Sequence, residues 1–296
     1  MRDNQVIGDQ WLEHKTVEVD GINVHYIKSG EGPVVLLLHG LGTSLITWSR
    51  NIKPLTDAGY TVVAPDLPGH GDSDKPKSLK YDPPAGARLI HRFLWALEIQ
   101  RLSMVGSSAG GLVAALFTLD YPEMVERLVL VASGGLGRRI SWILRMMSLP
   151  VLGEVLYQPW VHEKFDVSKW IFYRPPPFLS EILPEMARVR ALPGSRRAAL
   201  RSIRSSINFR GLRKRHFILN RLQQCTVPMM TVWGEEDIIL PVSHATAMQE
   251  ALPHSVVRTI PECGHWPHME KADEFNDLLA RFLQGSLDHQ PVPNCP

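Results

Sequence analysis

The sequence predicts an α/β fold in which eight strands form a mostly parallel sheet, helices flank the sheet, and a mainly helical segment interrupts the pattern. Two observations support this fold class. Short apolar runs alternate with longer helical patterns through the first half of the chain and again near its end. Between residues 134 and 224 the strand signals vanish, and the chain becomes rich in Leu, Met, Trp, Pro and Arg.

The first half of the chain contains signals for a hairpin followed by parallel strands. Asp20-Gly21 between two β-type runs is a strong two-residue hairpin signal. The continuous apolar runs at 34–38 and 60–64 suit strands buried on both faces of a parallel sheet. The elements predicted here are strands at 16–19, 22–28, 34–38, 60–64, 102–105 and 127–132, and helices between 39 and 59, at 85–97 and at 109–121.

The same alternation returns after Cys225 and completes the core. Strands are predicted at 228–233 and 255–260, and helices at 243–252 and 273–283. The resulting division is a core at 1–133 and 225–284, an inserted helical segment at 134–224 that we interpret as a cap, and a flexible tail at 285–296 without periodicity.

Composition indicates an ordinary globular protein. Of the 296 residues, 44% are hydrophobic and 21% are charged, and a net charge of +2 gives no reason to expect a nucleic-acid partner. No apolar run is long enough to span a bilayer and the first residues lack an apolar signal core, so we expect a cytoplasmic location. Cys225, Cys263 and Cys295 are too few for a disulfide framework and lack CxxC spacing, so we expect free thiols. The remaining histidines are scattered without ligand spacing, so we expect no metal site, and we also expect no cofactor.

The segment Gly106-Ser107-Ser108-Ala109-Gly110 fits the pattern G-x-S-x-G between a predicted strand and a predicted helix. In so tight a turn the nucleophile has a strained backbone, and the two glycines remove side chains that would otherwise collide. The glycine spacing puts Ser108 in the nucleophile position and leaves Ser107 as a packing residue.

A serine hydroxyl is a weak nucleophile at neutral pH, so it needs a base and an acid that orients the base. Asp237 and His265 each follow a predicted strand, and open α/β sheets build their sites at the carboxyl ends of strands. We expect His265 to be the general base and Asp237 the orienting acid. Glu235 and Glu236 are alternatives for the acid, and His268 is an alternative for the base.

Acyl transfer also requires donors for the developing oxyanion. The segment His39-Gly40-Leu41-Gly42 directly follows a predicted strand, and its glycines allow the backbone to approach the substrate closely. The expected donors are the backbone N–H groups of Leu41 and Ala109. We assign His39 to loop structure.

Four motifs in this order resemble the α/β-hydrolase superfamily over about residues 16–284. The motifs are His39-Gly-Leu-Gly42, Asp66-Leu-Pro-Gly-His-Gly-Asp-Ser73, Gly106-Ser-Ser-Ala-Gly110, and Gly234-Glu-Glu-Asp237 together with Gly264-His265. The resemblance favours His265 over His268 because a glycine precedes it, and it implies that Asp66 belongs to a structural loop. Epoxide hydrolases and haloalkane dehalogenases share the fold but use an aspartate at the elbow, so Ser108 argues against both activities.

The inserted segment is strongly basic. Residues 136–221 contain seventeen Lys or Arg and only five acidic residues, so they carry about +12 while the rest of the chain carries about −10. A solvated surface, attraction of an anionic substrate, and peripheral contact with an anionic membrane surface all fit this charge. The apolar run at 140–156 suits a pocket wall or a membrane-facing lid, and we favour the pocket.

The expected activity is hydrolysis of carboxylic esters with small to medium apolar acyl or aryl groups, because esters need little beyond a triad and oxyanion donors. An alternative follows from Cys263-Gly-His-Trp266 and the segment 272–276, which are similar to meta-cleavage product hydrolases. That resemblance implies carbon–carbon cleavage of vinylogous 1,5-diketone acids. A third hypothesis is a slow-turnover ligand-binding receptor on the same fold. The sequence does not indicate an oligomeric state.

Overall fold

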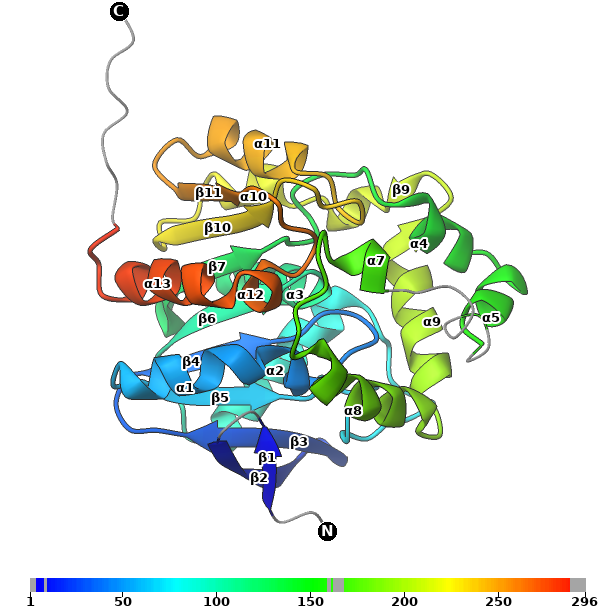
Figure 1. Cartoon of the computed structure of the whole chain (residues 1–296), viewed down its shortest axis with the longest axis horizontal. Helices are drawn as coiled ribbons and strands as arrows, with labels where there is room; N and C mark the ends of the chain where they lie inside the picture. Colours follow the sequence, from blue (N-terminus) through cyan, green and yellow to red (C-terminus); the bar gives the residue numbers. More distant parts are fainter. Residues whose placement is uncertain (1–3, 8–9, 159–160, 162–167, 288–296) are drawn as a thin grey trace, which may run out of the picture.

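A nine-stranded sheet forms the centre of the computed structural model, which describes residues 4–7, 10–158, 161 and 168–287 (Figure 1). The strands lie in the order β1-β2-β3-β5-β4-β6-β7-β10-β11. Pairing is antiparallel from β1 through β3 to β5 and parallel from β5 to β11. The strands are β1 Asn4–Ile7, β2 Gln10–Val19, β3 Ile22–Ser29, β4 Val34–Leu38, β5 Thr61–Pro65, β6 Leu102–Ser107, β7 Val125–Val131, β10 Met229–Gly234 and β11 Val256–Ile260.

All eight predicted strands are present, and β1 is an additional strand at the edge of the sheet. The predicted first strand was too short, because β2 begins at Gln10 rather than at residue 16. Residues 10–15 are mostly polar, so they lack the apolar alternation on which the prediction depended; pairing with β1 and β3 extends the strand instead. The expected mostly parallel sheet is confirmed.

Helices cover both faces of the sheet (Figure 1). α1, α12 and α13 pack on one face, and α2, α3 and α11 pack on the other. These helices are α1 Ser49–Asp57, α2 Pro83–Ala96, α3 Ala109–Asp120, α11 Ser243–Ala251, α12 Pro267–Glu270 and α13 Ala272–Leu283. The 3-10 turn η1 Leu45–Trp48 precedes α1, and the 3-10 turn η2 Pro122–Met124 follows α3. α2 begins where the Asp82 carboxylate accepts a hydrogen bond from the Ala85 N–H at 2.9 Å, two residues into the helix.

Strand β4 shows why the central strands have continuous apolar sequences. Val35 and Leu37 are buried beneath α1, α12 and α13, whereas Leu36 and Leu38 are buried beneath α2 and α3. Successive side chains of a strand point to opposite faces, so a strand covered on both faces needs an apolar residue at every position.

The inserted segment lies between β7 and β10 and is mainly helical in the part that the structure describes. Its elements are α4 Trp142–Met147, α5 Leu152–Leu156, α7 Ser168–Ile171, α8 Leu179–Ala191, α9 Ser195–Ser206, the paired strands β8 Ile207–Asn208 and β9 Gly211–Leu212, the 3-10 turn η3 Lys214–His216, and α10 Leu219–Leu222. None of the helices among the described residues has both the length and the apolar character needed to cross a bilayer.

Two expectations concern the chain end and the thiols. Most of the tail expected at 285–296 lies outside the described residues, as does Cys295. Cys225 and Cys263 are free and buried, and burial raises the pKa of the Cys263 thiol. The Cys263 thiol therefore stays protonated at neutral pH.

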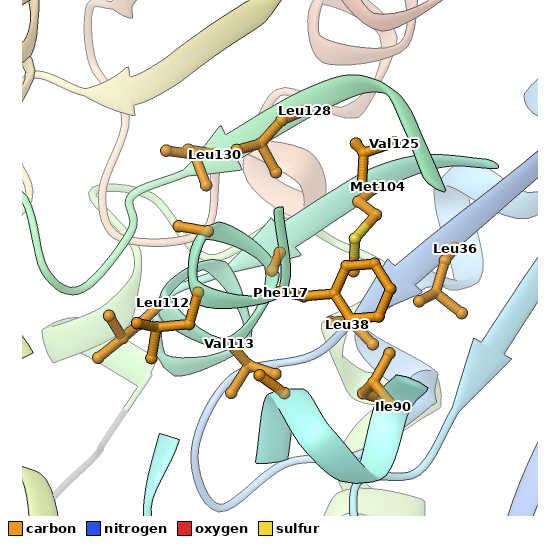
Figure 2. Packing of buried hydrophobic residues seen from close by; sticks show 14 of the residues in the cluster. Leu36, Leu38, Ile90, Met104, Leu112, Val113, Phe117, Val125, Leu128 and Leu130 are labelled. Atoms are coloured by element: carbon orange, nitrogen blue, oxygen red, sulfur yellow. The ribbon is translucent and has the colours of Figure 1, made fainter. Parts of the chain in front are cut away.

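Truncation of Phe117 to Ala is expected to lower the free energy of unfolding by about 3–5 kcal/mol. Phe117 is fully buried between α3 and the sheet, near Leu38 and Met104 (Figure 2), so truncation removes apolar burial and leaves a cavity. Phe209→Ala is the control, because the Phe209 ring is 57% exposed, and it should change the free energy by less than about 0.5 kcal/mol. Urea unfolding followed by circular dichroism measures both values, and equal losses would contradict this packing.

Candidate active site

Ser108 occupies the sharp turn between β6 and α3, with a backbone φ of +54° that L-residues rarely adopt. A side chain on Gly106 would lie 2.6 Å from the carbonyl oxygen of Gly110, so these two positions crowd each other as expected. A side chain on Gly110 would also collide with the carbonyl oxygens of Leu38 and His39. The glycines therefore permit both the turn and its close packing against the end of β4.

Three predicted residues meet at the carboxyl edge of the sheet. His265 Nε2 lies 3.0 Å from Ser108 Oγ, and His265 Nδ1 lies 2.7 Å from Asp237 Oδ2. The second oxygen of Asp237 accepts backbone N–H bonds from Ile239 at 2.8 Å and Leu240 at 2.9 Å. Because an ionised carboxylate only accepts, it places the proton of neutral His265 on Nδ1 and leaves Nε2 to accept from the serine hydroxyl.

The alternative residues face elsewhere. Glu235 accepts a hydrogen bond from the Thr259 hydroxyl, and Glu236 accepts one from the Cys263 N–H. His268 is buried against Trp48, with ring centroids 4.3 Å apart, and neither of its nitrogens has a hydrogen-bond partner within the described part of the chain. The Ser107 hydroxyl is also buried without a partner among those residues.

The loop at 39–43 lies beside Ser108. A side chain on Gly40 would lie 3.3 Å from Ser108 Cβ, so the loop backbone passes directly next to the serine. Ala109 is the first residue of α3, so its N–H has no acceptor within the helix. Leu41 and Ala109 both border the same cavity next to this serine. The two residues that carry the expected oxyanion donors therefore line one cavity.

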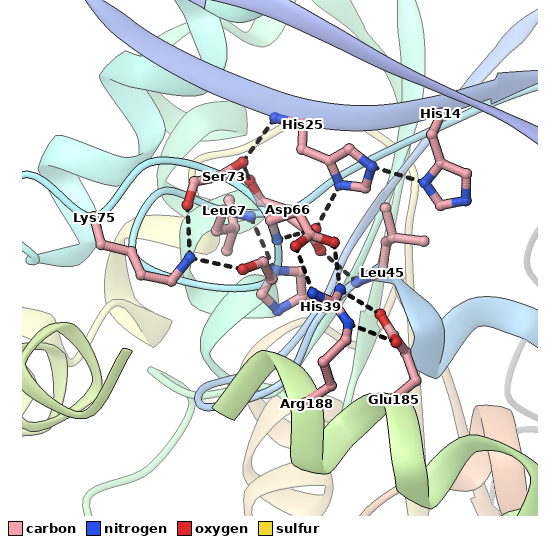
Figure 3. Close-up of polar contacts among 12 residues, drawn as sticks. His14, His25, His39, Leu45, Asp66, Leu67, Ser73, Lys75, Glu185 and Arg188 are labelled. Atoms are coloured by element: carbon pink, nitrogen blue, oxygen red, sulfur yellow. Dashed lines mark hydrogen bonds and ion pairs between the residues drawn. The ribbon is translucent and has the colours of Figure 1, made fainter. Parts of the chain in front are cut away.

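His39 fixes the shape of that loop. Its Nδ1 lies 2.7 Å from the Gly40 carbonyl oxygen and its Nε2 accepts a bond from the Leu67 N–H at 2.9 Å. Nδ1 is therefore the protonated nitrogen and the ring is neutral, in agreement with burial, which lowers the pKa of His39. His39 joins the loop at 39–43 to the segment that begins at Asp66 (Figure 3).

Asp66 is a buried carboxylate at the centre of a hydrogen-bond network (Figure 3). It accepts N–H bonds from Leu45 at 2.8 Å and Asp72 at 2.9 Å, and a bond from His25 Nδ1 at 2.7 Å. Burial alone would raise the pKa of Asp66, but the hydrogen bond and the charge of His25 outweigh burial and lower that pKa to about 2. Burial alone would lower the pKa of His25, and the bond to Asp66 instead raises it. These contacts agree with a structural role for the Asp66 segment.

One group of possible metal ligands occurs among the described residues, namely His25, Asp66 and Asp72. His25 and Asp66 already bond each other, and the carboxylate of Asp72 is held by the Arg188 guanidinium with N–O distances of 2.9 and 2.5 Å. Because these groups already have partners and a cation lies beside them, the donor set gives no support for a metal ion.

The inserted segment lies close to the site and its supporting loops at three places. Arg188 on α8 pairs with Asp72, and the backbone N–H of His265 donates to the Ile171 carbonyl oxygen at 2.6 Å. The Tyr157 hydroxyl would lie 3.9 Å from a side chain on Gly42. The segment therefore packs over the carboxyl edge of the sheet where Ser108 lies.

A cavity of about 120 Å³ extends from Leu41 and Ala109 between α2, α3 and α9. Val113, Ile203 and Ile207 are among the apolar side chains that line it. Most of its wall is apolar, so it suits an alkyl or aryl group rather than a strongly hydrated one.

Tyr157 and Arg190 were not singled out from the sequence. Tyr157 is buried beside the loop at 39–43, and burial raises the pKa of its hydroxyl. Arg190 is half-buried close to Tyr157, and burial lowers its pKa from the ordinary arginine value. No local pattern marks either residue, because the inserted segment contains many arginines and only its folding selects this one.

Comparison with known proteins now decides the family. A sequence model described as "Alpha/beta hydrolase family" matches residues 35–278. The chain belongs to the α/β-hydrolase family. This α/β hydrolase is 33% identical over 284 residues to an uncharacterized protein of Mycobacterium tuberculosis. The aligned region covers 92% of this chain and 81% of that protein.

Two further relatives of this α/β hydrolase have assigned activities. The 2-hydroxy-6-oxo-6-phenylhexa-2,4-dienoate hydrolase of Comamonas testosteroni is 30% identical, with 88% of this chain and 91% of that enzyme covered. The crystal structure of a membrane phospholipase A, described as a bacterial virulence factor, has a TM-score of 0.77 and 31% identity, with 93% of this chain and 86% of that chain covered. The expected family and fold are thereby confirmed.

Asp66→Asn is expected to lower the free energy of unfolding at pH 7 by about 2–4 kcal/mol, because an amide nitrogen cannot accept from His25 and Asp72. The pKa of Asp66 in the folded protein is about 2, below the ordinary value of 3.8. The stabilisation from its charge is therefore complete above pH 3.8 and is lost as the pH falls through 2. The difference between wild type and variant should therefore shrink on acidification.

Urea unfolding at several pH values measures this difference. Asp74→Asn is the control, since the Asp74 carboxylate accepts from the Asn23 N–H at an exposed site, and its cost should stay below about 1 kcal/mol. A pH-independent difference for Asp66→Asn would contradict the assigned role of its charge.

Proposed function

We propose that this α/β hydrolase is a serine esterase that cleaves carboxylic esters with small to medium apolar acyl or aryl groups. The observation that supports it most is the hydrogen-bonded chain from Ser108 through His265 to Asp237, located beside an apolar cavity. In the proposed division of the chain, residues 1–133 and 225–284 form the hydrolase core, and the inserted segment at 134–224 acts as a cap that closes this cavity.

In the proposed mechanism, Ser108 Oγ attacks the ester carbonyl carbon while His265 Nε2 accepts the hydroxyl proton. Asp237 stabilises the imidazolium that forms and holds its Nδ1–H. The N–H groups of Leu41 and Ala109 bind the oxyanion, and His265 then returns the proton to the leaving alcohol. A water molecule activated by His265 hydrolyses the acyl-enzyme and regenerates Ser108.

The apolar cavity supports the choice of acyl group. Leu41 and Ala109, whose N–H groups are assigned to the oxyanion, are among the residues that line it, so a substrate whose carbonyl oxygen binds there can direct its chain toward Val113 and Ile203. Burial of an alkyl chain in such a pocket contributes about 0.8 kcal/mol per methylene. We therefore expect rates to increase with chain length until the cavity is full.

A second candidate is carbon–carbon bond hydrolysis of a dienoic diketone acid. Relatives named as dienoate hydrolases support it, and so does Arg190, whose half-buried cation lies near Tyr157. The Tyr157 hydroxyl in turn lies beside Gly42. A dienoate carboxylate needs such a cation when it leaves water. Ester hydrolysis remains the first choice because the cavity lining is mostly apolar.

Ser108→Ala is expected to lower kcat/KM for p-nitrophenyl esters by at least about 10⁴-fold, because it removes the nucleophile. Asp237→Asn should cost on the order of 10⁴-fold, because the histidine loses its orienting partner. Ser107→Ala and Glu235→Gln are the matched controls and should stay within about tenfold of wild type, since neither side chain touches His265.

The same assay separates the candidate functions when a dienoic 1,5-diketone acid is included. Rapid diketone cleavage with feeble ester turnover would favour the second candidate. A single burst of acylation without steady turnover of either substrate would indicate a ligand-binding receptor.

Val113→Phe is expected to lower kcat/KM for octanoate esters at least about tenfold more than for acetate esters, because the larger ring fills the cavity. Ile203→Ala enlarges the same cavity and should move the optimum toward longer chains. Steady-state rates across the ester series measure both shifts. An unchanged chain-length profile in both variants would show that the acyl group binds elsewhere.

A further inference from the structure

Large apolar side chains are exposed on the outer side of the inserted segment. They gather on α4, α5 and the β8–β9 hairpin, which we call the tip and define as residues 138–155 and 207–215. Trp142 is 59% exposed, Val151 75%, Val155 43% and Phe209 57%. Arg145 links the two parts of the tip. It lies on α4 one helical turn after Trp142, and its guanidinium is 5.7 Å from the centre of the Phe209 ring.

The exposed residues form one side of a two-sided unit. On the inner side, Leu144 and Leu156 pack against a buried cluster that includes Leu200 and Ile203 of α9, and Leu41 at the candidate site packs against the same cluster. Trp142 and Val155 are not part of this cluster. The apolar run at 140–156 therefore divides between a buried side that supports the cavity region and an outer side open to solvent. Figure 1 shows α4 and α5 at the periphery of the molecule.

The tip is also strongly positive. It contains seven Lys or Arg and a single acidic residue, Glu154, which is paired with Arg204 at 2.7 Å. Arg139 and Arg210 are exposed, and neither they nor Arg145 form an ion pair with any residue that the structure describes. Exposed tryptophan and phenylalanine next to unpaired arginines are the combination that binds the headgroup boundary of a bilayer.

We propose that the tip docks on the surface of an anionic phospholipid bilayer. Trp142, Val151, Val155 and Phe209 enter the headgroup boundary, and Arg139, Arg145 and Arg210 pair with lipid phosphates. Outside residues 136–221 the chain is net negative, near −10, so the field of an anionic bilayer repels that part and leaves the inserted segment, with its tip, facing the lipid. Two tips in a two-fold dimer would instead bring like charges together.

This docking does not depend on the proposed ester hydrolysis. The test therefore uses the full chain with Ser108→Ala, so that hydrolysis of vesicle lipid does not confuse the measurement. Flotation with vesicles of phosphatidylcholine alone, or of equal parts phosphatidylcholine and phosphatidylglycerol, gives the partition coefficient. The expected result is stronger binding to the anionic vesicles that weakens as salt is added.

Two double variants in the Ser108→Ala background test the tip itself. Trp142→Ala with Phe209→Ala removes apolar contact, and Arg139→Glu with Arg210→Glu reverses charge. Each is expected to lower the partition coefficient at least about tenfold. Trp95→Ala, at a tryptophan that is 79% exposed on α2, and Lys28→Glu with Arg101→Glu are matched controls and should stay within about twofold.

Three results would overturn the proposal. The first is equal binding to both kinds of vesicle, and the second is wild-type binding by both tip variants. The third is a concentration-dependent dimer in sedimentation that the tip variants abolish, without vesicle binding, which would assign the tip to a second copy of the chain. The four substituted tip residues are exposed, so the variants are expected to fold. Unfolding midpoints check this before binding is compared.

Discussion

Parallel pairing of β4, β6, β7, β10 and β11 is the constraint on which the candidate site depends. Parallel strands bring their carboxyl ends to one edge, so the loops after β6, β10 and β11 meet there. Ser108 and His265 are 157 residues apart in the chain and are still within hydrogen-bond distance. Glycines at 106 and 110 let the turn after β6 pack against β4, which also brings Gly40 next to the serine.

A single buried carboxylate supports the walls of this site. Asp66 binds the segments that contain Leu45, Asp72 and His25, while His39 connects its neighbour Leu67 to the loop that carries Leu41. Asp72 in turn holds Arg188 on the inserted segment. The proposed oxyanion loop and the proposed cap are thus anchored to the same network, so a change at Asp66 affects both.

The two sides of the inserted segment differ in burial and in charge. Its inner side supplies Leu144, Leu156 and Tyr157 to the region of the site, where burial favours apolar packing. Its outer side combines apolar side chains with arginines that lack ion-pair partners among the described residues. The excess charge seen in the sequence is only partly paired, since Arg188 and Arg204 have carboxylate partners whereas Arg139 and Arg210 have none there.

Local patterns in the sequence were enough to predict the order of strands and helices and the turn that carries Ser108. Side-chain periodicity and glycine positions act over a few residues, so they can be read without a structure. The same reasoning placed Asp237 and His265 at strand ends. It missed β1 and the first half of β2, because their pairing rather than their composition makes them strands.

Only the tertiary structure decided which side chains meet. Backbone direction within a turn determines that Asp237, and not Glu235 or Glu236, faces His265. Packing across the whole chain selects Tyr157 and Arg190 from a segment with many similar residues, and it divides the run at 140–156 into a buried and an exposed side. The sequence by itself determined the local elements and the residue types available for chemistry, whereas contacts between distant segments, which have no local period, determined their arrangement.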